Sequence, residues 1–170
     1  MDKELAVQSL TDTMAKFTAY IGKRLPKDVK SKLIELKTLE TNPLAKSIYD
    51  SMDENQEAAD RLNRPSCQDT GVIQYFVEAG AHFPLLGELQ EILREATEEA
   101  TRTGPLRHNA VETFDEKNTG TNTGTQIPWL DWRIVPEQDT CTIDVYMAGG
   151  GCTLPGAAKV LMLGQGYEGV

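Results

Sequence analysis

The sequence predicts an α+β fold, with a mixed-sheet α/β arrangement as the alternative, and three observations lead to this prediction. Apolar residues recur at helical spacing through the first sixty residues. Short runs of β-branched and aromatic residues follow Pro65, and one long amphipathic pattern separates those runs. With 39% hydrophobic and 25% charged residues in a chain of 170, the composition is that of an ordinary globular protein.

Three helices are expected in the first segment, residues 1–64. Pro26 separates the first helix from the second. Thr41-Asn42-Pro43 begins the third, because a capping side chain there precedes proline near the first helical position. The third helix is expected to end near Asn63-Arg64-Pro65. The three apolar stripes are, in chain order, Val7, Leu10, Met14, Phe17 and Ile21; Val29, Leu33, Leu36 and Leu39; and Leu44, Ile48 and Met52.

The second segment, residues 65–170, is expected to contain the strands. Pro84 is expected to open a strong amphipathic helix, and Gly104-Pro105 ends it. Residues 118–125 are rich in Asn, Thr and Gly and predict turns. The β-rich runs that predict strands are Val72–Val77, Trp129–Val135 and Cys141–Met147.

The charge of the chain excludes several classes of partner. A net charge of −9 and a pI near 4.7 make nucleic acid and anionic lipid poor candidates, because phosphate binding needs clustered cations. No apolar run reaches membrane-spanning length, and charged residues interrupt the first twenty positions, so no signal peptide is expected. The odd number of cysteines, three, argues against a disulfide framework. We therefore expect a cytoplasmic protein.

The loop Pro65-Ser66-Cys67-Gln68-Asp69-Thr70-Gly71 is the most suggestive chemical grouping. It places a thiol, an amide, a carboxylate and a hydroxyl between a helix end and a strand start, where functional residues often lie. Arg107 has two interpretations. It is suited to forked recognition of a carboxylate, or it forms a surface ion pair with Glu112 or Asp115.

Gly149, Gly150 and Gly151 follow a predicted strand and also have two interpretations. Their backbone N–H groups can approach a ligand closely, or they simply form a tight turn. Nucleotide-binding templates fail, because Leu154 stands where the dinucleotide fingerprint needs glycine and Ala157 where the phosphate loop needs lysine. The cysteines Cys67, Cys141 and Cys152 lack the close pairs typical of zinc sites. They are inert thiols or ligands of an iron–sulfur cluster, and spacing alone does not decide.

Several motifs together resemble the class I iron–sulfur hydro-lyases, the family of class I fumarases and L(+)-tartrate dehydratases. The resemblance covers nearly the whole chain, in order and without large gaps. Its last motif is more similar to the tartrate dehydratase α subunit than to the fumarases. The motifs are Asn63–Gly71, Phe83–Gly87, Leu106–Val111, Lys117–Gly120 and Ala148–Gly156.

The resemblance implies a cofactor and an incomplete chain. Members of the family hold a [4Fe–4S] cluster by three cysteines, and Cys67 matches the first ligand. Cys141 and Cys152 do not match the other two, which lie in motifs not found here. The sequence is therefore expected to be a fragment of the class I fumarase N-terminal domain, with the 65–170 segment truncated at its C-terminal end.

The resemblance also implies a reaction, the dehydration of L(+)-tartrate to oxaloacetate and water. In this interpretation Asp69 is the acid that protonates the departing hydroxyl, and a β subunit supplies the catalytic base. The complete enzyme is expected to be an α2β2 heterotetramer, and the isolated chain inactive. The alternatives are a class I fumarate hydratase, a catalytically inactive truncated remnant, and a less favoured redox module. Residues implied in substrate binding are Gln68, Asp69, Arg107, Gly149, Gly150 and Gly151.

Overall fold

A computed structural model describes residues 2–67, 69–112, 114–150, 159–162 and 164–169. Helices and strands combine in an α+β arrangement with a mixed sheet, as predicted. The elements are α1 (Lys3–Ile21), α2 (Lys27–Leu39), α3 (Pro43–Leu62), β1 (Val72–Gly80), α4 (Leu89–Thr103), β2 (Trp129–Val135), β3 (Cys141–Ala148) and the short 3-10 helix η1 (Gly166–Gly169).

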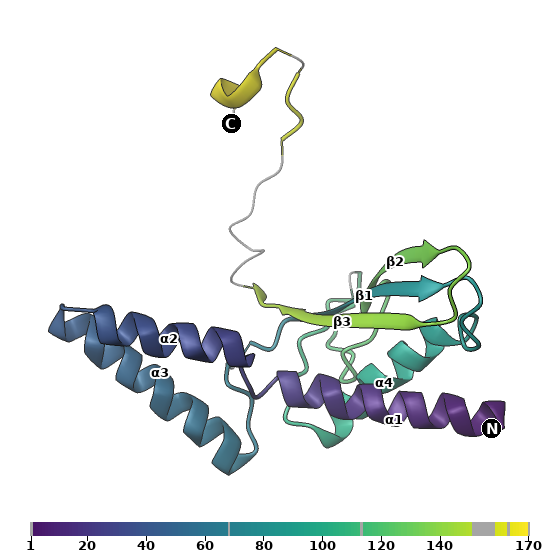
Figure 1. Cartoon of the computed structure of the whole chain (residues 1–170), viewed down its shortest axis with the longest axis horizontal. Helices are drawn as coiled ribbons and strands as arrows, with labels where there is room; N and C mark the ends of the chain where they lie inside the picture. Colours follow the sequence, from purple (N-terminus) through teal and green to yellow (C-terminus); the bar gives the residue numbers. More distant parts are fainter. Residues whose placement is uncertain (1, 68, 113, 151–158, 163, 170) are drawn as a thin grey trace.

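The sheet has the strand order β2-β1-β3, so β1 lies in the middle (Figure 1). β1 and β2 are parallel, and α4 makes the crossover between them, as parallel neighbours require. β3 pairs antiparallel with the other side of β1, with Val72 opposite Ala148 and Ala79 opposite Cys141. The start of β1 and the end of β3 therefore meet at one end of the sheet.

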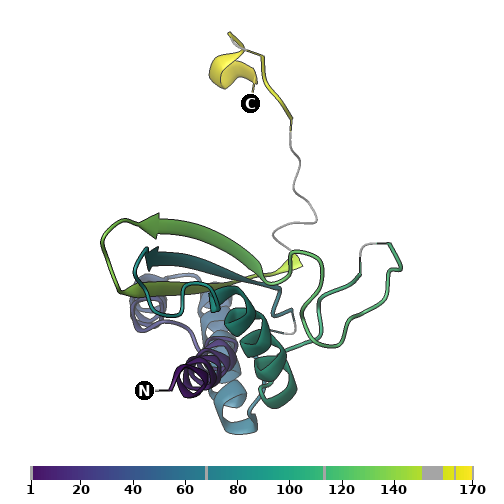
Figure 2. The ribbon, with the colours of Figure 1, turned by 90° about the vertical axis from the view of Figure 1, so that its right-hand side faces the viewer.

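Helices α1 and α4 pack against each other and cover one face of the sheet, beneath the strands in Figure 2. The core lies between these layers. Alternate residues of β1 point into it, which follows from the two-residue period of a strand. The buried cluster consists of Met14 and Ala15 from α1, Ile73, Tyr75, Val77 and Ala79 from β1, Leu89, Leu93, Ala96 and Ala100 from α4, and Leu106.

A buried polar contact joins the three central elements. The Tyr75 hydroxyl on β1 lies 3.0 Å from the Thr18 hydroxyl of α1 and 3.1 Å from the Thr97 hydroxyl of α4. Burial raises the pKa of Tyr75 above its usual value. Thr18 is fully buried, whereas Phe17, predicted to lie in the apolar stripe of α1, is exposed. The apolar pattern alone did not indicate that a threonine would occupy the core-facing position.

The start of α4 differs from the prediction. The helix begins at Leu89, not at Pro84, and residues 84–88 form turns. Leu86 N–H donates to the Phe83 carbonyl and Glu88 N–H to the Leu85 carbonyl, which are three-residue turn bonds. Gly87 lies within this stretch, and glycine is a poor helix former. The predicted apolar face is confirmed from Leu89 onward.

Helices α2 and α3 form a hairpin that lies beside this core, at the left of Figure 1. The Asn42 side chain caps α3 by accepting from Leu44 N–H at 2.9 Å, as the sequence predicts. Asn63 ends α3 in the left-handed conformation. Within the described residues, no helix has the combination of length and apolar character needed to cross a bilayer. The division of the chain after residue 64 stays a prediction.

Candidate functional site

Three loops meet at the end of the sheet where β1 begins and β3 ends. The first leads from α3 into β1, the second follows α4, and the third follows β3. Pairing of Val72 with Ala148 places the glycines after β3 beside the loop that contains Asp69. The fold therefore brings together residues that are about eighty positions apart in the sequence.

Asp69 lies at the centre of this meeting point and is partly buried. Its Oδ1 atom accepts hydrogen bonds from Gly71 N–H at 2.9 Å and from the Asn109 side-chain amide at 3.0 Å. Its Oδ2 atom accepts from Gly150 N–H at 2.6 Å. Donors from all three loops thus fix the orientation of the carboxylate. A carboxylate oxygen has two lone pairs, so Oδ2 can still accept a proton beside this bond.

Gly71 and Gly149 allow the loops to approach this closely. A Cβ atom on Gly71 would lie 2.1 Å from the Ala148 carbonyl oxygen, and the φ angle of Gly71 is +74°. Both facts favour glycine at this position, since other residues rarely adopt that backbone conformation. Gly149 lies against Asp69, with a virtual Cβ at 3.5 Å from Oδ2. The sequence suggested either ligand binding or a turn for this glycine run, and in the structure Gly150 N–H contacts Asp69.

Thr70 connects the first loop to the second. Its buried hydroxyl accepts from Arg107 N–H at 3.2 Å and lies 3.5 Å from the Arg107 carbonyl oxygen. The Asn109 amide also donates to it, at 3.3 Å. The Thr70 side chain therefore holds the backbone at Arg107 next to Asp69.

Asn109 and Asn122 are site residues that the sequence did not single out. Asn122 is buried; its Oδ1 accepts from Asn109 N–H at 2.8 Å and from Ala110 N–H at 3.2 Å. Its amide donates to the Arg107 carbonyl at 2.7 Å and to the Thr101 hydroxyl on α4 at 3.1 Å. Asn122 thereby anchors the second loop to the helix. Asn109 belongs to the motif Leu106–Val111, and that motif could have identified it as a site residue. Asn122 belongs to the run 118–125, which predicted only turns.

The side chain of Arg107 is exposed, and the described residues provide no ion pair for it. The alternative interpretation, a pair with Glu112 or Asp115, is thus not seen among the described salt bridges. A guanidinium without a carboxylate partner, on a loop fixed next to Asp69, is available to bind an anionic ligand. Its role in binding stays a prediction.

Cys67 lies two residues before Asp69 and is exposed. With Ser66 it lines a pocket of about 250 Å³ at the base of the α2–α3 hairpin. Cys141 stands at the other end of β3, about 23 Å of strand away from Ala148. Burial raises the pKa of the Cys141 thiol, which agrees with the predicted inert thiol.

An iron–sulfur cluster fits this chain only in part. Cys67 offers one accessible thiol, but the described residues contain no group of three or more cysteines, histidines or carboxylates able to hold a metal. A complete cluster site therefore needs ligands beyond those described. Three predicted residues, Gln68, Gly151 and Cys152, lie outside the described residues.

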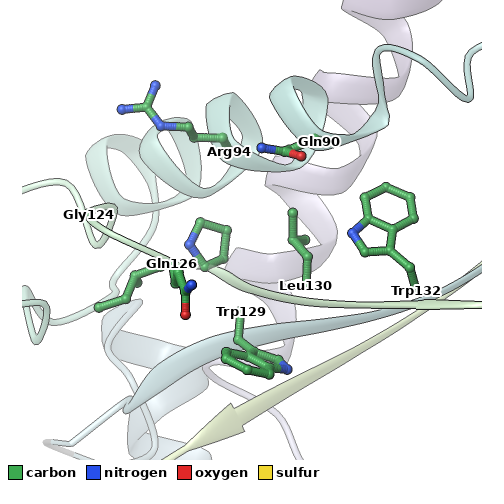
Figure 3. Close-up of a pocket in the computed structure, with 9 residues that line it drawn as sticks. Gln90, Arg94, Gly124, Gln126, Trp129, Leu130 and Trp132 are labelled. Carbon is green, nitrogen blue, oxygen red and sulfur yellow. The ribbon is translucent and has the colours of Figure 1, made fainter.

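A second pocket, shown in Figure 3, lies between α4 and the β2 edge and contains none of the predicted site residues. Leu130 and Trp132 point toward α4, where Gln90 and Arg94 stand, and Trp129 points to the other face of the strand. No carboxylate, thiol or imidazole occurs among the described residues that line it. This pocket therefore lacks an acid–base pair.

Comparison with known proteins places the chain in a family. A family model described as Fumarate hydratase (Fumerase) matches residues 11–170. The chain belongs to the fumarate hydratase family. Among this family's proteins, it is 59% identical over 169 residues to the L(+)-tartrate dehydratase subunit alpha of Escherichia coli K12 and to that of Shigella boydii serotype 4. It is 31% identical over 153 residues to a provisionally named L(+)-tartrate dehydratase subunit alpha from Methanocaldococcus jannaschii.

The alignments cover almost all of this chain but only part of each relative. The alignment spans 99% of the chain and 56% of the E. coli and Shigella relatives, and 86% of the chain and 52% of the Methanocaldococcus relative. The chain therefore corresponds to about half of a tartrate dehydratase α subunit. The names of these relatives, which describe an alpha subunit, imply that those proteins have a partner subunit.

Proposed function

We propose that this chain forms part of a [4Fe–4S]-dependent hydro-lyase that dehydrates a 2-hydroxy dicarboxylate, with L(+)-tartrate converted to oxaloacetate and water. The observation that supports this most strongly is the 59% identity to tartrate dehydratase α subunits along nearly the whole chain. The fixed carboxylate of Asp69, held by three loops, supports the same conclusion because a dehydration needs a positioned proton donor.

Cys67 is proposed as one ligand of the cluster, because its thiol is exposed and close in sequence to Asp69. When bound, the cluster would supply a Lewis acid for the leaving hydroxyl group. The remaining ligands are proposed to come from protein beyond the described residues, since the described part of the chain offers no second thiol near Cys67.

Asp69 is proposed to deliver a proton to the departing hydroxyl, so that the C–O bond breaks and water leaves. The Asn109 amide and Gly150 N–H keep its two oxygens oriented while the proton moves. Arg107 is proposed to bind one substrate carboxylate through its exposed guanidinium. Gln68 and the backbone of Gly149, Gly150 and Gly151 complete the proposed substrate contacts.

Loss of water also requires removal of a proton from carbon, and we assign this step to a β subunit. The enol that forms then becomes oxaloacetate by tautomerisation. The assembly is proposed to be an α2β2 heterotetramer in the cytoplasm, and the isolated chain to be inactive. The names of the relatives, which describe an α subunit, support a partner.

A class I fumarate hydratase is the second candidate, because the family model that matches the chain is described as fumarate hydratase. The relatives at 59% identity are all named for tartrate, and this favours tartrate as the substrate. A catalytically inactive remnant is the third candidate. The ordered environment of Asp69 argues against it, because the carboxylate accepts three hydrogen bonds from three loops.

The proposal can be tested in a chimera. This chain replaces the corresponding 56% of the E. coli tartrate dehydratase α subunit, which is then produced with its partner subunit. We expect turnover of L(+)-tartrate to exceed that of fumarate. Asp69→Asn should lower tartrate turnover by roughly 100-fold to 10,000-fold, the usual contribution of a general acid.

Asp131→Asn is the matched control, because Asp131 is an exposed carboxylate on β2, away from the loops around Asp69. It should leave turnover unchanged. Faster turnover of fumarate than of tartrate would favour the fumarase candidate. A chimera that assembles but has neither activity would favour the inactive remnant, and full activity of Asp69→Asn would remove Asp69 from the mechanism.

A further inference from the structure

The loop after α4, residues 107–110, is held mainly by another loop. Most of the hydrogen bonds described for its backbone come from the Asn- and Thr-rich run at 118–122. Thr119 N–H donates to the Ala110 carbonyl at 3.0 Å, and the Asn122 side chain makes three of the other bonds. The conformation of 107–110 therefore depends on side chains of a run that the sequence marked only as turns.

Asn122 is the central residue of this contact, and its residue surface is only 3% exposed. A side-chain amide has two lone pairs on its oxygen and two N–H groups on its nitrogen. All four are used, because the oxygen accepts from two backbone N–H groups and the nitrogen donates to a carbonyl and a hydroxyl. The reversed amide would place oxygen against that carbonyl and nitrogen against the two N–H groups, so the contacts define which end is which.

The two ends of the Asn122 amide contact different parts of the site. The nitrogen donates to the carbonyl of Arg107 at 2.7 Å, the residue whose exposed guanidinium is proposed to bind a substrate carboxylate. The oxygen accepts from Asn109 N–H at 2.8 Å, and the Asn109 amide donates to Asp69 Oδ1 at 3.0 Å. The nitrogen thus contacts the proposed binding residue, and the oxygen reaches the proposed acid through one intervening side chain.

We infer that Asn122 is a positioning residue of the dehydration, with a separate role for each end of its amide. The nitrogen sets the affinity for the substrate by fixing the backbone of Arg107, and the oxygen sets the rate by fixing Asn109 beside Asp69. The Thr101 hydroxyl of α4 lies 3.1 Å from the same nitrogen and ties the side chain to the helix layer. This inference rests on the proposed function, because both roles refer to that reaction.

Thr123 provides a matched control, because it is buried next to Asn122 but contacts other residues. It is 4% exposed, and its hydroxyl donates to the Glu98 carboxylate of α4 at 3.0 Å. Its described hydrogen bonds go to Glu98 and Thr121, and none of them goes to residues 107–110. Thr123→Val therefore removes a buried polar contact from the same run without reaching the site. It should lower stability by about 1 to 3 kcal/mol and leave kcat and KM within about twofold.

The test measures kcat and KM for L(+)-tartrate in the chimera with the E. coli α subunit and its partner. Asn122→Asp keeps an oxygen for Asn109 N–H but places the second oxygen against the Arg107 carbonyl. It should raise KM about tenfold or more and change kcat less than about threefold at the pH of maximal turnover. Asn122→Gly permits the φ of +58° and removes both ends, so it should raise KM and also lower kcat about tenfold or more.

Hydrogen exchange of the Asn109 and Ala110 amides, followed by NMR on the 170-residue chain, checks the contacts without catalysis. Exchange should be about tenfold faster in Asn122→Gly than in Asn122→Asp, which keeps the acceptor, and circular dichroism checks that each variant folds.

An unaltered chimera without turnover of tartrate or fumarate would contradict the proposed function, and the role of Asn122 with it. In an active chimera, three results would overturn the inference alone. The first is kinetics of Asn122→Asp no different from those of Thr123→Val. The second is the same loss of kcat in Asn122→Asp as in Asn122→Gly. The third is unchanged exchange of the two amides in Asn122→Gly.

Discussion

Asp69 depends on residues that come from distant parts of the chain. Its carboxylate accepts bonds from Gly71, Asn109 and Gly150, and Asn122 in turn holds the loop that contains Asn109. A shift of any of these loops would change where the proposed acid points. At the scale of single residues, the proposed role of Asp69 therefore depends on close backbone contacts as much as on the carboxylate itself.

Gly71 is the residue at which this close contact is easiest to test. Gly71→Ala places a Cβ atom 2.1 Å from the Ala148 carbonyl oxygen and requires an unfavourable φ of +74°. We expect the free energy of unfolding to fall by about 2 kcal/mol or more, measured by urea denaturation. Gly87→Ala is the control, since nothing lies within 4 Å of its added Cβ and it should change stability by about 0.5 kcal/mol or less. Equal effects of the two substitutions would contradict the close approach of the loops.

At the scale of elements, the sequence predicted most of the architecture. The bounds of β2 and the capped start of α3 agree with the prediction, because turn residues and a capping asparagine mark them locally. The start of α4 was predicted five residues early, since Leu85 and Leu86 continue the apolar pattern although Gly87 favours turns. The pairing of β1 with β3 was not predicted, because local sequence patterns do not show which distant strands pair.

The candidate site, like the fold, could be predicted from the sequence only in part. The sequence singled out the loop around Asp69 and the glycines after β3, and the fold brings the two together, while their roles stay predictions. Asn122 could not be found in this way, because a buried asparagine that holds a loop has the same sequence signal as an asparagine in an exposed turn. Only the contacts with Arg107 and Asn109 distinguish the two.

Tyr75 joins α1, β1 and α4 and gives these elements a testable pH dependence. Its pKa is raised by burial, so its contribution to stability is fully present below about pH 10 and is lost as pH rises through the higher folded-state value. We expect the free energy of unfolding to decrease steadily above pH 10. Tyr75→Phe should make this decrease shallower while lowering stability at pH 7 by about 1 to 3 kcal/mol, because the Thr18 and Thr97 hydroxyls lose a buried partner.

The measurement is urea denaturation at several pH values between 7 and 11, with Tyr146→Phe as the control at an exposed tyrosine. An identical pH dependence for Tyr75→Phe and the unaltered chain would show that Tyr75 does not ionise with unfolding, against the buried network seen here.

At the scale of the whole molecule, the chain corresponds to about half of its tartrate dehydratase relatives, 56% of the E. coli α subunit. Exposed apolar side chains occur in two places of the described part: on the α2–α3 hairpin, where Leu44 and Ile48 are exposed, and on the sheet face opposite α1 and α4, where Phe76, Trp129 and Tyr146 are exposed. A site with one accessible cysteine and a fixed acid agrees with a chain that contributes to a shared active site. The central claim is that Cys67 and Asp69 work only together with groups from other polypeptide.

Anaerobic reconstitution with iron and sulfide tests this claim most directly, on the isolated chain and on the chimera with the E. coli α subunit in parallel. We predict that the isolated chain loses its iron and sulfide on treatment with a chelator, because the described residues offer one accessible thiolate. The chimera should retain a full [4Fe–4S] complement, which Cys67→Ser abolishes and Cys141→Ser does not. A stable stoichiometric cluster on the isolated chain, or an intact cluster in the Cys67→Ser chimera, would contradict the account.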